Sequence, residues 1–275
     1  MRKLLAAALL VLFSHGGIYA QQRPMVTEPV HTVEPGHLRF ELGFEFFQKA
    51  VFPFSGLEGD LSRLGVLGLR LGVGKNVELQ LLGTVHNVLN IDRQFPAPNT
   101  PNLGFNDDSS SDVGDFTLAA KVRFKQESDG SPALGFRFGF EMPNASNENG
   151  LGNDELNAFG SFLIEKRVGR ARAIGNLGIA ILGDPTDSNA QDDLFTYGVA
   201  LIYEVNGKVN LLADLNGRAG DAGIGTEEQT QLRLGAQFKA GGLYWDVGAF
   251  FGFQDADPDT GVIIGVSKDF KLWDF

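Results

Sequence analysis

The chain of 275 residues contains no cysteine. Disulfide bonds and a lipid-modified cysteine are therefore excluded, and stability must come from a closed hydrogen-bonded sheet or from a sizeable core. Beyond the N-terminal segment, no stretch approaches the ~18 consecutive apolar residues of a membrane-spanning helix. This absence excludes the class of helical membrane proteins.

Basic residues are also few. Lysine and arginine number 23 against 34 aspartate and glutamate residues, a formal net charge of -11. Because phosphate contacts need clustered lysine and arginine, this balance argues against a nucleic-acid partner. Tryptophan and tyrosine are scarce, at 2 and 4 residues, whereas phenylalanine reaches 23. Any aromatic belt at a membrane interface would therefore consist mainly of phenylalanine, which lacks the polar tip that favours the headgroup region.

The inventory for catalysis and cofactor binding is poor. Only four histidines occur, and His86 alone falls near the expected external end of a strand. A hydrolase triad needs a serine beside a histidine that a third group holds, and no serine in the expected strands has such a setting. The glycine-rich piece 217–225 lacks the Lys-Ser/Thr pair of a phosphate-binding loop. We therefore expect neither an enzyme nor a bound cofactor.

The first twenty residues have the layout of a cleaved export signal. Arg2 and Lys3 provide the positive start, residues 4–13 the short apolar core, and Ala20 a small residue at which a signal peptidase could cut. Residues 21–36 follow with three prolines and no hydrophobic period, which indicates an extended periplasmic lead-in. A plug inside a barrel lumen is the alternative for this segment.

From residue 37 onward the sequence alternates apolar and polar residues. Between residues 37 and 48, leucine and phenylalanine occupy the even positions 38–46, whereas Arg39, Glu41 and Glu45 occupy odd ones. Successive side chains of a strand point to opposite faces, so this pattern predicts strands with one apolar and one polar face. The pattern recurs in about twelve segments. We therefore predict an all-β fold, a transmembrane antiparallel up-and-down β-barrel of about 12 strands, spanning residues 37–275.

Long polar breaks and short turns alternate between the segments. Asn206-Gly207 is the strongest hairpin signal. The break from Val88 to Asp112 is too long and polar for a simple turn, and we expect it outside the bilayer as the entrance constriction.

If the first strand rises from the periplasm, every long break is external. Charge supports this orientation, because the external breaks are acidic and the periplasmic turns basic. The acidic residues are Asp107, Asp108, Asp112, Glu148, Asp184, Asp187, Asp192, Asp221, Glu227, Glu228, Asp255, Asp257 and Asp259. The basic residues are Lys75, Lys125, Lys166, Arg167, Arg170, Lys208 and Lys239.

Charged residues at inward positions are the candidate lining of the lumen. A turn centred near Gly130 would set Arg123 opposite Arg137, with Glu141 diagonally near Lys121. One hypothesis is a belt of charges that narrows the lumen and selects permeants, and the alternative is an ion-paired interior that fills the barrel. The candidates are Arg39, Glu41, Glu45, Arg70, Glu78, Asp115, Lys121, Arg123, Arg137, Glu141, Asp214, Arg233 and Asp246.

One acidic loop resembles the start of a calcium-binding loop. Asp255, Asp257 and Asp259 occupy alternate positions, but no glycine follows at the required place and no glutamate closes the set. A solvated acidic loop is the preferred interpretation, so we expect no metal and keep these three residues as weak candidates.

Three short motifs resemble an outer-membrane family. The run Asp112-Val113-Gly114-Asp115-Phe116-Thr117-Leu118-Ala119-Ala120-Lys121 is followed by the strand that ends at Glu141-Met142-Pro143 and later by Asn176-Leu177-Gly178. These motifs resemble the outer-membrane barrel family named for the meta-pathway of phenol degradation. The resemblance implies an outer-membrane transporter of aromatic or other hydrophobic compounds, without defined binding residues.

These observations together predict a barrel in the bacterial outer membrane that works as a passive channel or transporter for small hydrophobic or aromatic molecules. Its partners would be outer-membrane lipid, lipopolysaccharide and the permeant. The alternative is a structural or adhesive barrel without an open pore, whose acidic loops bridge to lipopolysaccharide phosphates through divalent cations. A soluble exported β protein is a third possibility. Inward glycines such as Gly43, Gly68, Gly139, Gly198, Gly235 and Gly248 could leave an open path or ease strand curvature.

Overall fold

The computed structural model describes residues 23–105 and 107–274, so the expected export signal lies outside the described residues. Strands account for nearly all of the regular structure, with one short 3-10 turn, η1 (Thr100–Asn102). Among the described residues, no helix is long and apolar enough to cross a membrane. The strands are β1 (His37–Phe52), β2 (Leu57–Gly74), β3 (Val77–Gln94), β4 (Ser109–Asp112), β5 (Phe116–Lys125), β6 (Ala133–Met142), β7 (Asn157–Val168), β8 (Ala171–Gly183), β9 (Gln191–Asn206), β10 (Val209–Ala219), β11 (Gln229–Ala240), β12 (Leu243–Gly252) and β13 (Thr260–Lys271).

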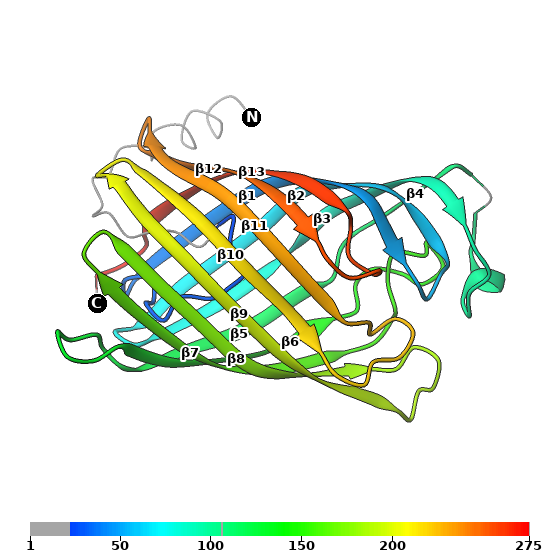
Figure 1. Cartoon of the computed structure of the whole chain (residues 1–275), viewed down its shortest axis with the longest axis horizontal. Helices are drawn as coiled ribbons and strands as arrows, with labels where there is room; N and C mark the ends of the chain where they lie inside the picture. Colours follow the sequence, from blue (N-terminus) through cyan, green and yellow to red (C-terminus); the bar gives the residue numbers. More distant parts are fainter. Residues whose placement is uncertain (1–22, 106, 275) are drawn as a thin grey trace.

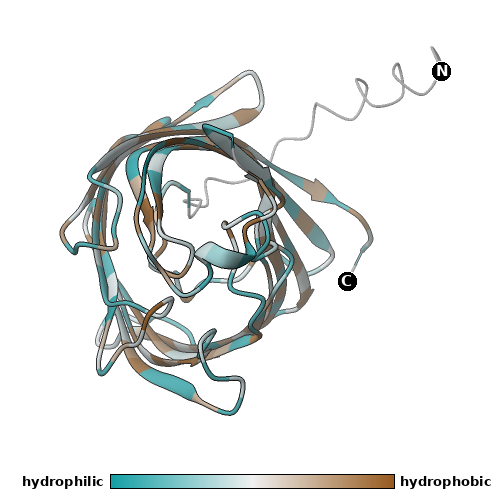
Figure 2. Cartoon of the chain, turned by 90° about the vertical axis from the view of Figure 1, so that its right-hand side faces the viewer, coloured by the Kyte–Doolittle hydropathy of each residue, from teal (hydrophilic) through white to brown (hydrophobic). Residues whose placement is uncertain are grey.

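Twelve of these strands close into an antiparallel barrel. Each strand pairs with its neighbours in sequence, β3 pairs with β5 past the short β4, and β1 pairs with β13 to seal the wall. The strand β4 extends the sheet only at the end of β3. Figures 1 and 2 show the barrel from the side and from the end that carries the long loops. The predicted fold class and strand number are confirmed, and closure leaves no bare sheet edge in the wall.

The two faces of the wall differ as the alternation predicts. Outward apolar side chains are widely exposed, for example Phe162 with 66% and Val199 with 64% of its surface. Inward polar neighbours are buried, and Glu41 retains only 2%. A soluble protein would bury its phenylalanines and expose its carboxylates, so this arrangement fits a lipid-facing exterior around a polar interior.

Short turns gather at one end of the barrel and long connections at the other (Figure 1). Two residues join β2 to β3, β7 to β8, β9 to β10 and β11 to β12. The hairpin signal at Asn206-Gly207 lies at one of these turns, where β9 ends at Asn206. Longer connections follow β3, β6, β8, β10 and β12 at the opposite end.

The connection from β3 to β5 is more ordered than its composition predicts. Strand β3 continues to Gln94, and β4 pairs Ser109–Asp112 with residues 87–90 of β3. Leu103 and Phe105 pack against a cluster formed by Leu57, Leu89 and Leu151. This segment therefore packs on the neighbouring β1–β2 turn and on the loop after β6.

Candidate functional site in the barrel lumen

Residues 23–36 lie inside the barrel, in the half that carries the short turns (Figure 1). The segment is extended, as the sequence predicts, but it runs through the lumen and not beside the barrel. The backbone N–H of Val26 donates to Asp214 at 2.6 Å. That of Val30 donates to Glu165 at 2.8 Å. Of the two placements considered for these residues, the contacts are those of a plug, and we call residues 23–36 the plug segment.

Apolar contacts also hold the plug segment in the lumen. Met25 is buried against inward Ile174, Ile202 and neighbouring residues of β8–β10. Val30, which is fully buried, packs on Ala133 and Leu163. The interior of the barrel is therefore not uniformly polar, because inward apolar side chains lie against Met25 and Val30 of the plug segment.

Inward glycines form the groove in which the plug segment lies. A Cβ atom at Gly198 would come within 2.5 Å of Oγ1 of Thr27. At Gly235 and Gly248 a Cβ atom would lie 2.8 and 3.2 Å from Cγ of Pro24. At Gly43 it would overlap the guanidinium of Arg23, which pairs with Glu45 and Asp246. These four glycines thus provide space for the plug segment, an alternative to an open path or to curvature that the sequence alone did not suggest.

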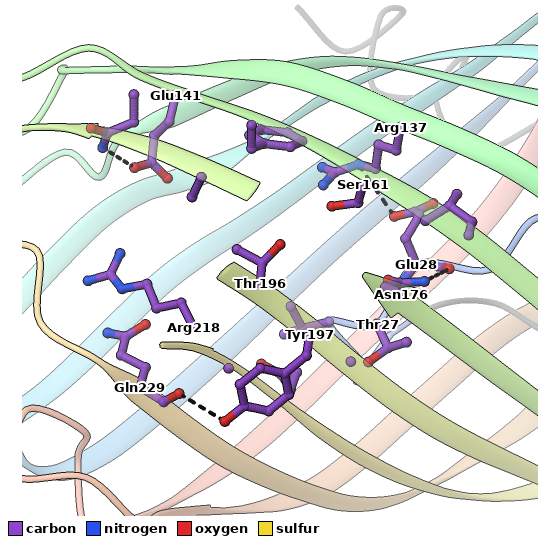
Figure 3. Close-up of a pocket in the computed structure, with 18 of the residues that line it drawn as sticks. Thr27, Glu28, Arg137, Glu141, Ser161, Asn176, Thr196, Tyr197, Arg218 and Gln229 are labelled. Carbon is purple, nitrogen blue, oxygen red and sulfur yellow. Dashed lines mark hydrogen bonds and ion pairs between the residues drawn. The ribbon is translucent and has the colours of Figure 1, made fainter. Parts of the chain in front are cut away.

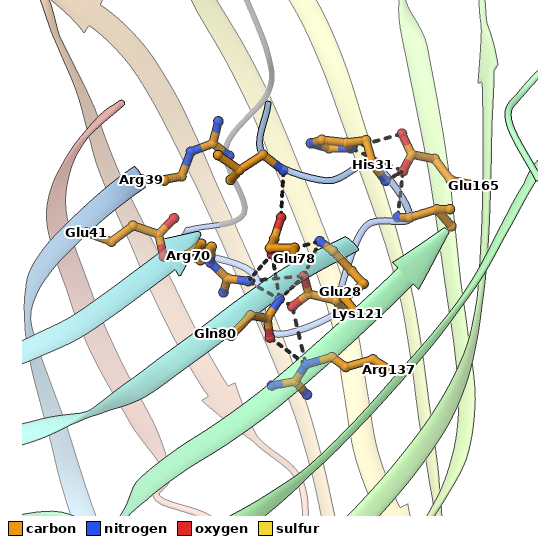
Figure 4. Close-up of polar contacts among 12 residues, drawn as sticks. Glu28, His31, Arg39, Glu41, Arg70, Glu78, Gln80, Lys121, Arg137 and Glu165 are labelled. Carbon is orange, nitrogen blue, oxygen red and sulfur yellow. Dashed lines mark hydrogen bonds and ion pairs between the residues drawn. The ribbon is translucent and has the colours of Figure 1, made fainter. Parts of the chain in front are cut away.

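Glu28 connects distant parts of the wall. Its backbone exchanges two hydrogen bonds with the side-chain amide of Asn176 on β8, at 2.6 and 2.9 Å. Its carboxylate reaches Lys121 on β5 at 2.7 Å and Arg70 on β2 at 3.1 Å. Strands β8 and β2 lie well apart in the ring. A single residue of the plug segment therefore spans the lumen (Figures 3 and 4).

The side chain of Glu28 belongs to a balanced cluster of buried charges. Lys121 also contacts Glu78 at 3.2 Å, and Arg70 contacts Glu41 at 3.2 Å. Gln80 donates to Glu28 and accepts from the Nε of Arg137 at 2.8 Å. Three cations thus face three anions in a largely buried site, where each charge needs its partners. The six charged residues are Glu28, Glu41, Arg70, Glu78, Lys121 and Arg137.

Replacement of Glu28 by glutamine is expected to release the plug segment. The variant leaves Arg70 and Lys121 short of one buried partner, which typically costs about 3–5 kcal/mol. The ratio of unplugged to plugged barrels should rise by on the order of 10²–10³, since about 1.4 kcal/mol corresponds to a factor of ten. Open probability in a planar bilayer measures the change. Glu34→Gln is the matched control, because Glu34 lies on the same segment with its side chain about half exposed. A folded Glu28→Gln barrel that opens no more often than the control would contradict the expectation.

Most of the predicted lining residues face the interior. Arg39 forms two hydrogen bonds with Asp269, and Glu45 pairs with Arg63 at 3.1 Å. Arg233 donates to the carbonyl of Pro24 at 3.2 Å. The residues that the structure brings to the lumen wall are Arg39, Glu41, Glu45, Arg70, Glu78, Lys121, Arg137, Glu141, Asp214, Arg233 and Asp246.

Arg123 does not lie opposite Arg137. Lys121 takes that position, and Arg123 pairs with Gly135. The turn pairs Ser128 with Ser131, and a bulge after Arg123 adds one residue to β5, so the register differs by two residues from a plain hairpin centred on Gly130. Arg123 instead binds the β2–β3 turn, donating to the carbonyl of Lys75 at 2.7 Å and to the side chain of Asn76. Glu141 lies opposite Thr117, away from Lys121.

Asp115 anchors the long loop after β6 and takes no part in the charge cluster. Its carboxylate accepts the backbone N–H groups of Asn144 and Ala145, both at 2.8 Å. Burial raises the pKa of this carboxyl group, the two N–H groups oppose the rise, and the charge of nearby Glu141 adds to it. Asp115 therefore positions the loop that borders the mouth of the barrel.

Substitutions at Asp115 should separate its hydrogen bonding from its charge. Asp115→Ala leaves two N–H groups unpaired, and we expect a loss of about 1–3 kcal/mol with faster proteolysis of residues 143–156. Asp115→Asn keeps an acceptor and should protect the loop. Because the folded pKa is raised, ionisation of Asp115 costs stability as pH rises from the ordinary carboxyl value through the folded one, and only the wild type should show this dependence. Limited proteolysis across pH measures both effects, and equal cleavage of the two variants would refute the assignment.

The acidic loop after β12 is organised around Asp257. The carboxylate of Asp257 accepts the backbone N–H of Thr230 at 2.9 Å and that of Gln254 at 3.1 Å. Asp259 pairs instead with Lys49. Over residues 23–105 and 107–274, no group of three histidine, aspartate or glutamate side chains is arranged to hold a metal ion. The buried carboxylate of Asp257 therefore has a structural role in closing the loop.

Three adjacent cavities lie between the long loops and the plug segment. The outermost, about 500 Å³, shares Val51, Pro53 and Glu227 with a second of about 200 Å³. The second shares Arg218 and Gln229 with the innermost, of about 330 Å³. The inner cavity lies within the barrel and ends on Val26, Thr27 and Glu28 (Figure 3). None of the described residues between 88 and 112 lines these three cavities, and the role of this segment as the entrance constriction stays a prediction.

Several residues of this site escaped the sequence reasoning. Asn176, Arg218 and Thr196 line the inner cavity, and Glu165 holds the plug segment. Their inward parity within the strands was a usable signal, since Asn176 lies opposite Gly198 and Glu165 opposite Ala133. Glu28 carried no such signal, because its segment has no period.

A closed 12-strand wall with an apolar exterior and a polar interior defines an outer-membrane β-barrel. One solved structure shares this fold. An outer membrane channel from Pseudomonas putida F1 aligns with a TM-score of 0.61 and 15% identity, over 88% of this chain and 98% of that one. The translocator domain of the autotransporter NalP from Neisseria meningitidis aligns at 0.46 and 12%, over 97% and 93%. The toluene transporter TbuX from Ralstonia pickettii aligns at 0.43 and 8%, over 88% and 90%.

The sequence places the chain more narrowly. A comparison with curated protein sequences finds no match. The model of the family described as "Putative MetA-pathway of phenol degradation" matches residues 21–270. The chain belongs to this family, as the motifs between Asp112 and Gly178 indicate. The match begins before β1, so it includes the plug segment.

Proposed function

We propose that the chain is a channel of the bacterial outer membrane for the passive uptake of small hydrophobic or aromatic molecules, closed in this structure by its plug segment. The observation that carries the proposal is the inner cavity of about 330 Å³. It adjoins the cavities of the loop end and stops at the plug segment. A solid barrel would pack this volume with side chains, whereas a permeation path needs a space of this kind.

The proposed orientation puts the long loops outside the cell and the short turns in the periplasm. The signal in residues 1–20 would direct export and then be cleaved, after which the plug segment would enter the barrel from the periplasmic end. Permeants would then reach the cavities from outside and would leave when the plug segment moves. The apolar outer face would lie in lipid, with the acidic loops near lipopolysaccharide.

The ion-paired plug segment also favours a second function, a structural barrel without an open pore. The two functions differ in what the plug does. In a channel it is a movable barrier, whereas in a structural barrel it is a permanent filling. The charged lining would select permeants in the first case and only satisfy buried charges in the second.

Liposome swelling distinguishes these functions. Proteoliposomes carrying the wild type or Glu28→Gln would be placed in isotonic arabinose or sodium benzoate, with Glu34→Gln as the control. We expect slow swelling for the wild type and control and rapid swelling for Glu28→Gln. Barrels that fold in all three forms but admit neither solute would overturn the channel and favour the structural barrel.

A further inference from the structure

Two guanidinium groups enter the inner cavity from different strands. Arg137 on β6 uses its Nε for Gln80, and its guanidinium lies 4.6 Å from the ring centroid of Phe159. Arg218 on β10 uses its Nε for the carbonyl of Glu227 at 2.8 Å. Within the described part of the chain, the terminal nitrogens of both groups have no hydrogen-bond partner. Figure 3 shows both side chains reaching into the cavity.

The described carboxylates around the cavity leave these terminal nitrogens without a partner. Glu141 accepts a hydrogen bond from Asn157 at 3.0 Å at the cavity wall. Glu28 lies on the floor, where it is already shared between Lys121 and Arg70. Arg137 is itself one of the three cations balanced by Glu28, Glu41 and Glu78, and its Nε lies 3.8 Å from Glu28. Glu141, Glu227 and Asp257 lie near Arg218. Among the described residues, the cavity therefore offers guanidinium N–H donors without a partner, and not a net positive charge.

The remaining wall of the cavity is largely apolar. Phe159, Leu163 and Leu182 line it, together with Ala158 and Ala180. A volume of about 330 Å³ lies at the lower end of the range of about 300–1,000 Å³ for small-molecule sites. This space suits one aromatic ring with a small substituent. An anion that lacked an apolar part would leave these side chains in contact with water.

We propose that the inner cavity binds small aromatic carboxylates. The carboxylate would accept hydrogen bonds from the terminal nitrogens of Arg137 and Arg218, whose planar groups match its two oxygens. The ring would lie against Phe159 and Leu163. The inference rests on the proposed function and makes it more specific, because it gives the permeant a negative charge.

The acidic outer cavity is the main argument against an anion. Asp221, Glu228 and Asp255 line it. The carboxylate of Glu228 accepts the backbone N–H of Gly220 at 2.9 Å. Asp221 and Asp255 are exposed to solvent, where salt screens charges beyond ~8 Å at physiological ionic strength. The buried guanidinium groups are screened less, so the loops should slow the entry of an anion more than they weaken its binding.

Calorimetric titration of the detergent-purified full chain tests the proposal. Benzoate, benzyl alcohol and benzylamine carry similar rings with negative, neutral and positive substituents. We expect benzoate to bind about tenfold more tightly than benzyl alcohol, and benzylamine to bind least, since charge-assisted hydrogen bonds to arginine are the strong ones. Equal affinities, or a preference for benzylamine, would overturn the proposal.

A variant tests whether Arg218 causes the preference for benzoate. Arg218→Gln should weaken benzoate about tenfold and leave benzyl alcohol unchanged, because only the charged hydrogen bonds are lost. Arg167→Gln is the control, since Arg167 is exposed at the short-turn end and pairs with Glu204. Benzoate binding that is unchanged in Arg218→Gln would also overturn the proposal.

Two outcomes distinguish this proposal from the proposed channel function. If Glu28→Gln liposomes swell in arabinose but the protein does not bind benzoate, the proposed ligand is wrong and the channel function stands. If the protein binds benzoate but the liposomes do not swell, the channel function is wrong.

Discussion

A chain that lacks residues 23–34 is expected to form a barrel that stays open. The deletion removes Glu28 from the lumen together with the apolar contacts of Met25 and Val30. It keeps Gly36, whose carbonyl accepts the backbone N–H of Leu272 and holds the start of β1 to the end of the chain. Water would then hydrate Asp214, Glu165 and the other wall groups that held the plug segment. Single-channel recording should show a steady current in place of a closed baseline.

Two controls make the deletion informative. Heat-dependent mobility on a gel would show whether the shortened chain still forms a closed barrel. The plug segment added back as a synthetic peptide should reduce the current, because its partners on the wall remain in place. A folded deletion variant that does not conduct would show that the long loops, and not the plug segment, are the barrier.

Gly198→Val should open the channel without removing any charge. A Cβ atom at Gly198 would lie 2.5 Å from Oγ1 of Thr27, so the valine side chain takes the place of the plug segment. Overpacking of this kind costs about 1–3 kcal/mol. Displacement also breaks the bonds of the Val26 and Thr27 backbone to Asp214. We expect open probability to rise at least about tenfold, as a loss of about 1.4 kcal/mol implies.

Gly175→Val is the matched control for this prediction. Gly175 on β8 lies opposite outward-facing Val199, and a Cβ atom there would meet only the side chain of Ile164 at 3.0 Å. Both variants add the same side chain to neighbouring strands, one toward the lumen and one toward lipid. If both variants opened the channel equally, the effect would come from a weakened wall, and the role assigned to the glycine groove would be wrong.

The architecture could be predicted because lipid imposes a strict rule on the wall. Between residues 38 and 47 of β1 every second residue faces hydrocarbon, so Leu42 and Phe44 alternate with Glu41 and Glu45. The same rule placed the strand turns, since only polar residues can interrupt such a pattern. Strand number, closure and inward faces all follow from this one constraint.

The register of one hairpin could not be predicted in the same way. The pairing of Ser128 with Ser131 and the single extra residue in β5 after Arg123 each move the register by one residue, and the alternation shows such a bulge only as a small local fault. The pairing of Lys121 with Arg137 therefore needed the coordinates. It matters for the site, because Lys121 and not Arg123 contacts Glu28.

The position of the plug segment could not be predicted for a different reason. Its backbone bonds to side chains such as Asn176 and Glu165, and not to another backbone, so no period of two is imposed on its sequence. The plug segment is instead reflected in the sequence of the wall, where glycines at positions 43, 198, 235 and 248 provide space for it. Glycines on the inward parity of a barrel strand are therefore a signal for a segment inside the lumen.

The partners of the plug segment also set an order of assembly. Arg23 requires Glu45 on β1 and Asp246 on β12, and Val33 requires Glu78 on β3. The residues that precede the first strand therefore cannot settle until nearly the last strand has joined. The docked plug segment therefore indicates a barrel in which the strands from β1 to β12 have already come together.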